Sequence, residues 1–121
     1  MRHSLYVMAF AFALSAPVWA QDGAQELAQA RQAVDKATQA DADQYAPDLI
    51  GLARQGLEQA QRAAGDRRER KNAPALALRA AADADLARAR SEEATAAAQL
   101  QLRRNAVNPL QRQLSPGEDR R

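Results

Sequence analysis

The chain has 121 residues, a formal net charge of +2 and no cysteine. Its length allows one small domain, and the lack of cysteine excludes a disulfide scaffold, a thiol enzyme and a lipoprotein attached through an N-terminal cysteine. Because positive and negative charges nearly balance, the composition implies no strong global field.

The first 20 residues have the three-part layout of a secretory signal peptide. Arg2 supplies the positive start, and the apolar stretch from Leu5 to Leu14 leads into a short segment that ends at the expected cleavage site, between Ala20 and Gln21. A retained membrane anchor is the alternative, but this apolar stretch would reach only roughly half of a hydrocarbon core of about 30 Å. We therefore expect an exported, periplasmic protein that keeps no transmembrane span after processing and is not a lipoprotein.

The first helix is predicted over about 24–40. Ala, Leu, Gln, Arg and Glu dominate this region and the rest of the mature chain, and these residues lose least free energy on entering a helix. The segment from Asp41 to Gln44 is expected to be an exit loop. The expected buried stripe has spacings of three and four: Leu27, Ala30, Val34 and Ala37.

The second helix is predicted over about 47–64. Pro47 and Asp48 indicate its start, since proline is favoured in a first helical turn and an acid complements the positive end of the helix. Gly65 and Asp66 are expected to end it, and a charged connector follows. Its expected buried stripe is Ile50, Ala53, Leu57, Ala60 and Ala64.

The third helix is predicted over about 73–104, with Asn72 as its cap and Pro74 in its first turn. The segment 105–121 contains prolines and a glycine and predicts a disordered tail. A seam of small residues repeats along the helix at spacings of three and four: Ala77, Ala80, Ala84, Ala87, Ser91, Ala94 and Ala98.

These elements predict an all-α fold, either an antiparallel helical hairpin or a three-helix bundle, with a long third helix that partly protrudes. At about 1.5 Å per residue, the first two helices would be roughly 25 Å long and the third nearer 45 to 50 Å. The overshooting end would expose apolar surface and is hypothesised to bind another helix, in a second copy or in a different protein. The alternative is an exposed helix that depends on intrinsic propensity alone. The candidate interaction residues are Ala94, Ala98, Leu100 and Leu102.

The mature sequence predicts no enzyme, no cofactor and no metal site. General acid–base and nucleophilic catalysis usually require His, or Ser or Cys coupled to a base, and the mature sequence lacks both His and Cys. Neighbouring carboxylates such as Asp83 and Asp85 would point to different sides of a helix, so they should not converge on a metal ion.

The connector after the second helix is a second candidate binding feature. Its basic residues could contact phosphates of lipopolysaccharide or of another anionic polymer. Asp66 and Glu69 dilute this charge, so a simple soluble loop is the competing interpretation. Nucleic acid is not expected, because export removes that partner and no aromatic residues interleave with the arginines. The basic residues are Arg67, Arg68, Arg70 and Lys71.

Two segments of the mature chain carry a family resemblance. The first is Gln44-Tyr45-Ala46-Pro47-Asp48-Leu49 with the alanine-rich run up to Asp66, and the second is the run from Ala80 to Arg90. Together they resemble domain-of-unknown-function family 4398, found in exported proteins of Gram-negative bacteria, over about Leu27 to Ala98. The resemblance implies no catalytic residues. Since members are often envelope lipoproteins or are joined to a peptidoglycan-binding domain, it also implies contact with envelope components.

Overall fold

A computed structural model of the chain describes residues 22–115, and within this range it contains helices but no strand. The all-α fold class is therefore confirmed. The predicted signal peptide, with its cleavage site at Ala20 and Gln21, lies outside the described residues, as does segment 116–121. The elements are α1 (Asp22–Gln39), α2 (Ala42–Tyr45), α3 (Pro47–Gly65), the 3₁₀ turn η2 (Arg70–Asn72) and α4 (Ala73–Leu114).

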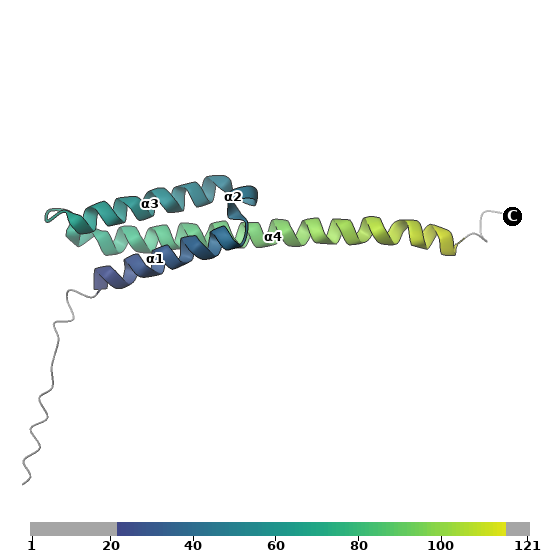
Figure 1. The fold of residues 1–121 in the computed structure, drawn as a ribbon, viewed down its shortest axis with the longest axis horizontal. Helices are drawn as coiled ribbons and strands as arrows, with labels where there is room; N and C mark the ends of the chain where they lie inside the picture. The colour runs from purple at the N-terminus through teal and green to yellow at the C-terminus, as the bar shows by residue number, and fades with distance from the viewer. Residues whose placement is uncertain (1–21, 116–121) are drawn as a thin grey trace, which may run out of the picture.

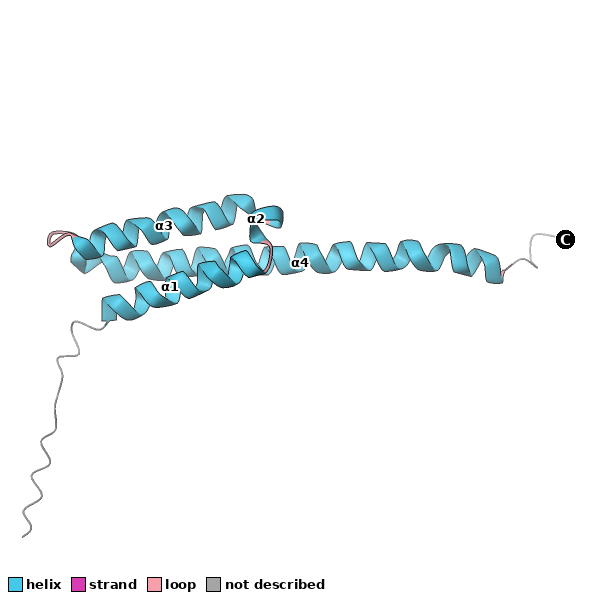
Figure 2. Ribbon diagram, in the orientation of Figure 1, coloured by secondary structure: helices cyan, strands magenta, loops and turns pink. Residues whose placement is uncertain are grey.

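The three long helices form a bundle with α4 at its centre, so the three-helix alternative is the one observed. Helices α1 and α3 pack chiefly on α4 and only a little on each other. Figure 1 shows that α1 and α4 run in the same direction. Helix α3, which lies between them in the sequence, runs in the opposite direction. Both shorter helices lie along the first half of α4, and the second half extends alone, as the predicted helix lengths require (Figure 2).

The segment predicted as an exit loop, from Asp41 to Gln44, instead contains the single helical turn α2. Asp41 precedes it with a left-handed backbone, at a φ of 62°. The next residue, Ala42, is fully buried in the core, and the backbone N–H of Ala46 donates to its carbonyl oxygen. The chain therefore reverses through a tight turn that is anchored in the core rather than through a solvated loop.

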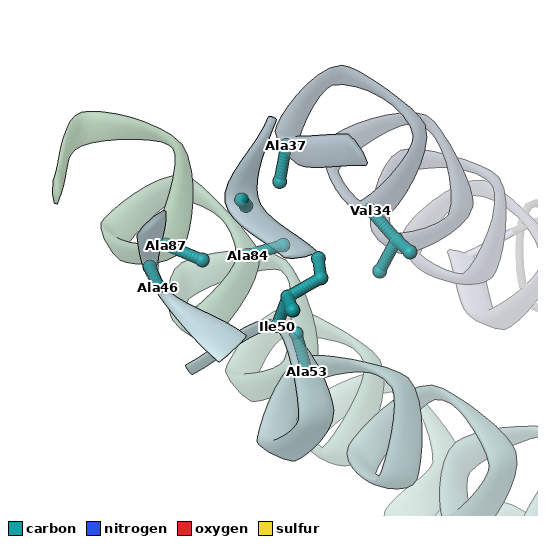
Figure 3. Packing of buried hydrophobic residues seen from close by; sticks show 8 residues of the cluster. Val34, Ala37, Ala46, Ile50, Ala53, Ala84 and Ala87 are labelled. Carbon is teal, nitrogen blue, oxygen red and sulfur yellow. The ribbon is translucent and has the colours of Figure 1, made fainter. Parts of the chain in front are cut away.

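The core consists almost entirely of alanine methyl groups. Among the described residues, Ile50 is the largest side chain that is fully buried, and it lies near Val34 and Ala37 of α1 and near Ala84 of α4 (Figure 3). Alanine buries little apolar area, so this core stabilises the fold mainly by letting backbones lie close together. The remaining buried alanines are Ala30, Ala42, Ala46, Ala53, Ala60, Ala63, Ala73, Ala77, Ala80 and Ala87.

Three members of the predicted stripe of α3 are buried: Ile50, Ala53 and Ala60. Leu57 is only partly buried, and near the end of the helix Ala63 is buried whereas Ala64 is only half-buried. Gly56 of α3 lies directly against Ala80 of α4. A Cβ atom at this position would lie 3.2 Å from the Cβ of Ala80, which is closer than ordinary van der Waals contact. Gly56 therefore lets the two helices approach more closely than an alanine would.

The predicted disordered tail is wrong over residues 105–114, because α4 continues to Leu114. Pro109 lies inside the helix, where it removes one backbone hydrogen bond without ending the element. The residues after it, such as Leu110, Gln111 and Arg112, favour helix and extend it past the proline.

Candidate functional site

Helix α4 leaves the bundle after Ser91, its last buried residue. The Ser91 hydroxyl donates a hydrogen bond to the carbonyl oxygen of Ala40, just past the end of α1. Every residue of the described part of α4 from Ala96 onward is exposed. We call residues 96–114 the free segment. At about 1.5 Å per residue it is roughly 28 Å long.

The four candidate interaction residues of this end do not form one surface. Ala94 is half-buried and Ala98 is exposed, and both continue the line of the bundle seam. They lose their neighbours because α1 ends at Gln39. The side chains of Leu100 and Leu102 are 49% and 69% exposed. Since 3.6 residues complete a turn, Leu100 points away from the seam and Leu102 lies close to it.

Three further large apolar side chains were missed by the sequence interpretation, because they fall in the segment predicted as a tail. Val107, Leu110 and Leu114 are all exposed on the free segment. Their spacing in the sequence could have revealed them, because Leu100, Val107 and Leu114 follow one another at intervals of seven residues, as in a coiled coil.

These residues belong to one longer pattern, which we call the back stripe. Its spacings alternate between four and three without interruption from Ala82 to Leu114, and all its members are exposed. By helical geometry it lies on roughly the opposite side of α4 from the buried seam. The members of the back stripe are Ala82, Leu86, Ala89, Glu93, Ala96, Leu100, Arg103, Val107, Leu110 and Leu114.

The basic connector lies at the other end of the bundle from the free segment (Figure 1). All four of its basic residues are exposed. Asp66 is partly engaged by the turn itself, because its Oδ1 accepts a hydrogen bond of 2.9 Å from the backbone N–H of Arg68. The structure therefore keeps the two candidate surfaces well apart. The basic residues are Arg67, Arg68, Arg70 and Lys71.

The family model with the description Domain of unknown function (DUF4398) matches residues 25–102. The chain belongs to this family. The matched range covers nearly all of the bundle and the first part of the free segment, whereas residues 103–114 lie beyond it. No curated protein and no solved structure gave a match to the chain.

In the part of this DUF4398 chain that the structure describes, the best-formed ion pair joins the turn before α3 to α3 itself. Arg54 Nη1 lies 2.5 Å from Asp43 Oδ1, and its Nη2 lies 2.9 Å from Oδ2 and 3.0 Å from Thr38 Oγ1. Hydrogen bonding to Arg54 holds the pKa of the Asp43 carboxyl below its usual range. The bidentate geometry ties α2 to α3 and, through Thr38, to the last turn of α1.

The clefts of the DUF4398 chain are open and mixed in polarity. One, of about 580 Å³, lies beside the end of α1 and is lined by polar residues that include Lys36, Arg88 and Glu92. Arg88 Nε already pairs with Glu92 Oε1 at 3.3 Å. Within residues 22–115, no group of three or more His, Cys, Asp or Glu side chains is placed to hold a metal ion. In the same range, none of the helices has both the length and the hydropathy needed to cross a membrane.

Proposed function

We propose that this DUF4398 protein is a non-enzymatic helical module of the cell envelope that acts in the periplasm by binding other helices. The observation that carries the proposal is the free segment of α4, which leaves the bundle with exposed leucines on it. The signal peptide expected over residues 1–20 and the resemblance to exported proteins support the location.

The free segment is costly to keep helical in a single chain. An isolated helix of this length is marginally stable in water, and Pro109 weakens it further. Leu100 and Leu110 are each about half exposed, so they gain little from hydrophobic burial in the single chain. A second helix packed along the segment would bury these side chains and stabilise the helical conformation.

The location is tested by mass spectrometry of the protein recovered from periplasmic and cytoplasmic fractions. We expect a periplasmic form that begins at Gln21 and contains no tryptophan, because Trp19 is the one tryptophan of the chain. A cytoplasmic protein that retains Trp19 would contradict export.

The interaction is tested with a photocrosslinking amino acid placed at Leu110 in cells with an intact envelope. We expect covalent adducts with a helical protein, whether a second copy or a different chain. The matched control is Leu52, which is similarly exposed but lies on the bundle, and it should give far fewer adducts. Absence of adducts at Leu100 and at Leu110 would reject the proposed role of the free segment.

The basic connector supports a second candidate function, the binding of anionic envelope polymers. The observation in its favour is that Arg67, Arg68, Arg70 and Lys71 are all exposed on one turn. Salt discriminates between the two functions. An electrostatic binder should lose its partner steeply between low and physiological salt, whereas helix docking should not.

A further inference from the structure

We infer that the back stripe of α4 pairs with the back stripe of a second copy of this chain, antiparallel and in a register centred level with Ala98. The inference rests on the proposed function, because it uses the same free segment, and it adds the identity of the partner and the orientation. The resulting dimer would have its two bundles on either side of a central two-helix coiled coil.

The spacing of the back stripe is that of a coiled coil. Alternation of four and three is the heptad pattern of a coiled coil, in which two positions of every seven face the partner helix. Leu86, Glu93, Leu100, Val107 and Leu114 occupy the first position of this pattern. The second position is occupied by Ala82, Ala89, Ala96, Arg103 and Leu110.

The stripe is free along its whole length, including the part inside the bundle. Leu86 is 46% exposed although its neighbour Ala87 is fully buried, because the two side chains point in different directions from the helix axis. Helices α1 and α3 cover the seam that contains Ala84 and Ala87. A partner helix can therefore lie along the back stripe without displacing either of them.

The positions of the stripe are symmetric about Ala98. When two copies run antiparallel in this register, each first-position residue faces a second-position residue, as antiparallel coiled coils require. We call each pair of stripe residues that face each other across the two copies a layer. In three of the five kinds of layer a small residue faces a large one, so the side chains interdigitate. The layers are Ala82 with Leu114, Leu86 with Leu110, Ala89 with Val107, Glu93 with Arg103, and Ala96 with Leu100.

Charge complementarity selects both the partner and the direction. Glu93 and Arg103 are the only charged members of the stripe, and they face each other in this register, twice in the dimer. A parallel pairing in register would instead place Glu93 against Glu93 and Arg103 against Arg103. Like charges facing each other across a coiled coil are destabilising, so the pattern favours the antiparallel arrangement.

The single chain leaves these charges available. Glu93 Oε2 accepts a hydrogen bond of 3.2 Å from Arg90 on the exposed surface, and Arg103 makes no salt bridge with any residue of the described range. One kind of like-charge pair is brought close in the dimer: Arg90 of one copy lies beside Arg104 of the other on the flank of the coiled coil. Both are exposed to solvent, so this approach costs little.

The orientation is tested by disulfide trapping, for which a chain without cysteine is well suited. The processed protein is prepared as two variants, Leu86→Cys and Leu110→Cys, which are mixed and oxidised gently. We expect a disulfide-linked dimer in the mixture and little from either variant alone. A dimer that forms from Leu110→Cys alone would indicate parallel pairing and overturn the inference.

The charge pairing is tested by reversal of each charge, with the dimer dissociation constant measured by sedimentation equilibrium. Glu93→Arg alone and Arg103→Glu alone each place like charges in two layers, and should weaken self-association by about tenfold or more. The double variant restores opposite charges and should recover most of the affinity. Circular dichroism at a concentration where each variant is still dimeric should show the same helix content for all three, since both side chains are exposed.

The two proposals fail in different ways. A processed protein that stays monomeric at high concentration, yet still crosslinks to another envelope protein through Leu110, would overturn self-pairing and leave the proposed function intact. Failure of the double variant to recover affinity would also overturn the register. A protein that gives no crosslink of any kind from the free segment would reject both.

Discussion

Asp41 holds a backbone conformation that few side chains adopt, and the turn between α1 and α2 depends on it. Its φ of 62° lies in the left-handed region, which costs most L residues about 1–2 kcal/mol and which Asp, Asn and Gly tolerate best. Its side chain makes no capping hydrogen bond in the turn. Substitutions at Asp41 therefore report mainly on the backbone.

We predict that Asp41→Ala lowers the free energy of unfolding by about 1 kcal/mol, because alanine has neither the freedom of glycine nor the polar side chain of aspartate. Asp41→Gly should be at least as stable as the natural chain. Urea denaturation followed by circular dichroism checks both variants. Equal losses for alanine and glycine would show that the aspartate side chain, rather than the backbone, stabilises the turn.

Asp43 gives the fold a dependence on acid pH. Because Arg54 lowers the pKa of Asp43 in the folded chain, this carboxylate stabilises the fold above its unfolded pKa, near 3.8. The contribution is lost as the pH falls through the lower folded pKa. We predict that the difference in melting temperature between the natural chain and Asp43→Asn is constant from neutral pH to about 5 and disappears at lower pH.

The size of this effect should be modest, because both side chains of the pair are roughly half exposed. Added salt should reduce it at neutral pH. The Arg54→Gln variant is the control, since it removes the same hydrogen bonds from the other side and should lose the same dependence on pH. If Asp43→Asn remained destabilising at pH values where the carboxyl is protonated, the ion pair would not be the cause.

At the scale of the element, two glycines of α3 have opposite surroundings. A Cβ at Gly51 would meet no other group within 4 Å, whereas a Cβ at Gly56 would press on Ala80 of α4. Both glycines are helical, and alanine in a helix is favoured over glycine by about 0.5–1 kcal/mol when nothing else changes. Alanine substitution at Gly51 therefore measures helix propensity alone, whereas the same substitution at Gly56 also measures helix packing.

We predict that Gly51→Ala raises the free energy of unfolding by about 0.5–1 kcal/mol. Gly56→Ala should instead lower the free energy of unfolding, because Ala80 is fully buried and its methyl group cannot rotate out of the way. Thermal and urea denaturation of both variants give the comparison. Equal stabilisation by the two substitutions would mean that α3 and α4 can move apart without cost.

The helices and their buried faces could be predicted because small residues recur at regular spacing. Ala30, Ala53 and Ala84 are all buried as their stripes predict, and Gly65 ends α3 as expected. The turn α2 could not be predicted, because it depends on Ala42 reaching a core that local sequence does not show. The predicted end of α4 is too early because Pro109 resembles a helix stop, whereas a proline inside a helix weakens it without always ending it.

At the scale of the whole molecule, the sequence likewise predicts one part of the candidate site and not the other. Helix lengths alone predict the overshoot of α4, and Leu100 and Leu102 are exposed on its end as predicted. The back stripe was not recognised, because the small-residue seam dominates the pattern and because half of the stripe lies beyond Ala98. Seam and stripe share one helix: the seam is buried in the bundle, and the stripe is the surface that we propose binds a second copy.

This division leads to a prediction about truncation. A chain that ends after Gln99 retains Ser91 and every other buried residue of α4, so its bundle should unfold with nearly the natural free energy. It loses Leu100, Arg103 and the apolar residues beyond, and with them five positions of the back stripe. We therefore expect the truncated chain to remain helical in its bundle but to be monomeric in sedimentation at concentrations where the full processed chain dimerises.

Urea denaturation should be compared at low concentration, where dimerisation does not add to the stability of the full chain. A bundle that lost several kcal/mol on truncation would show that the free segment contributes to folding and is not reserved for a partner.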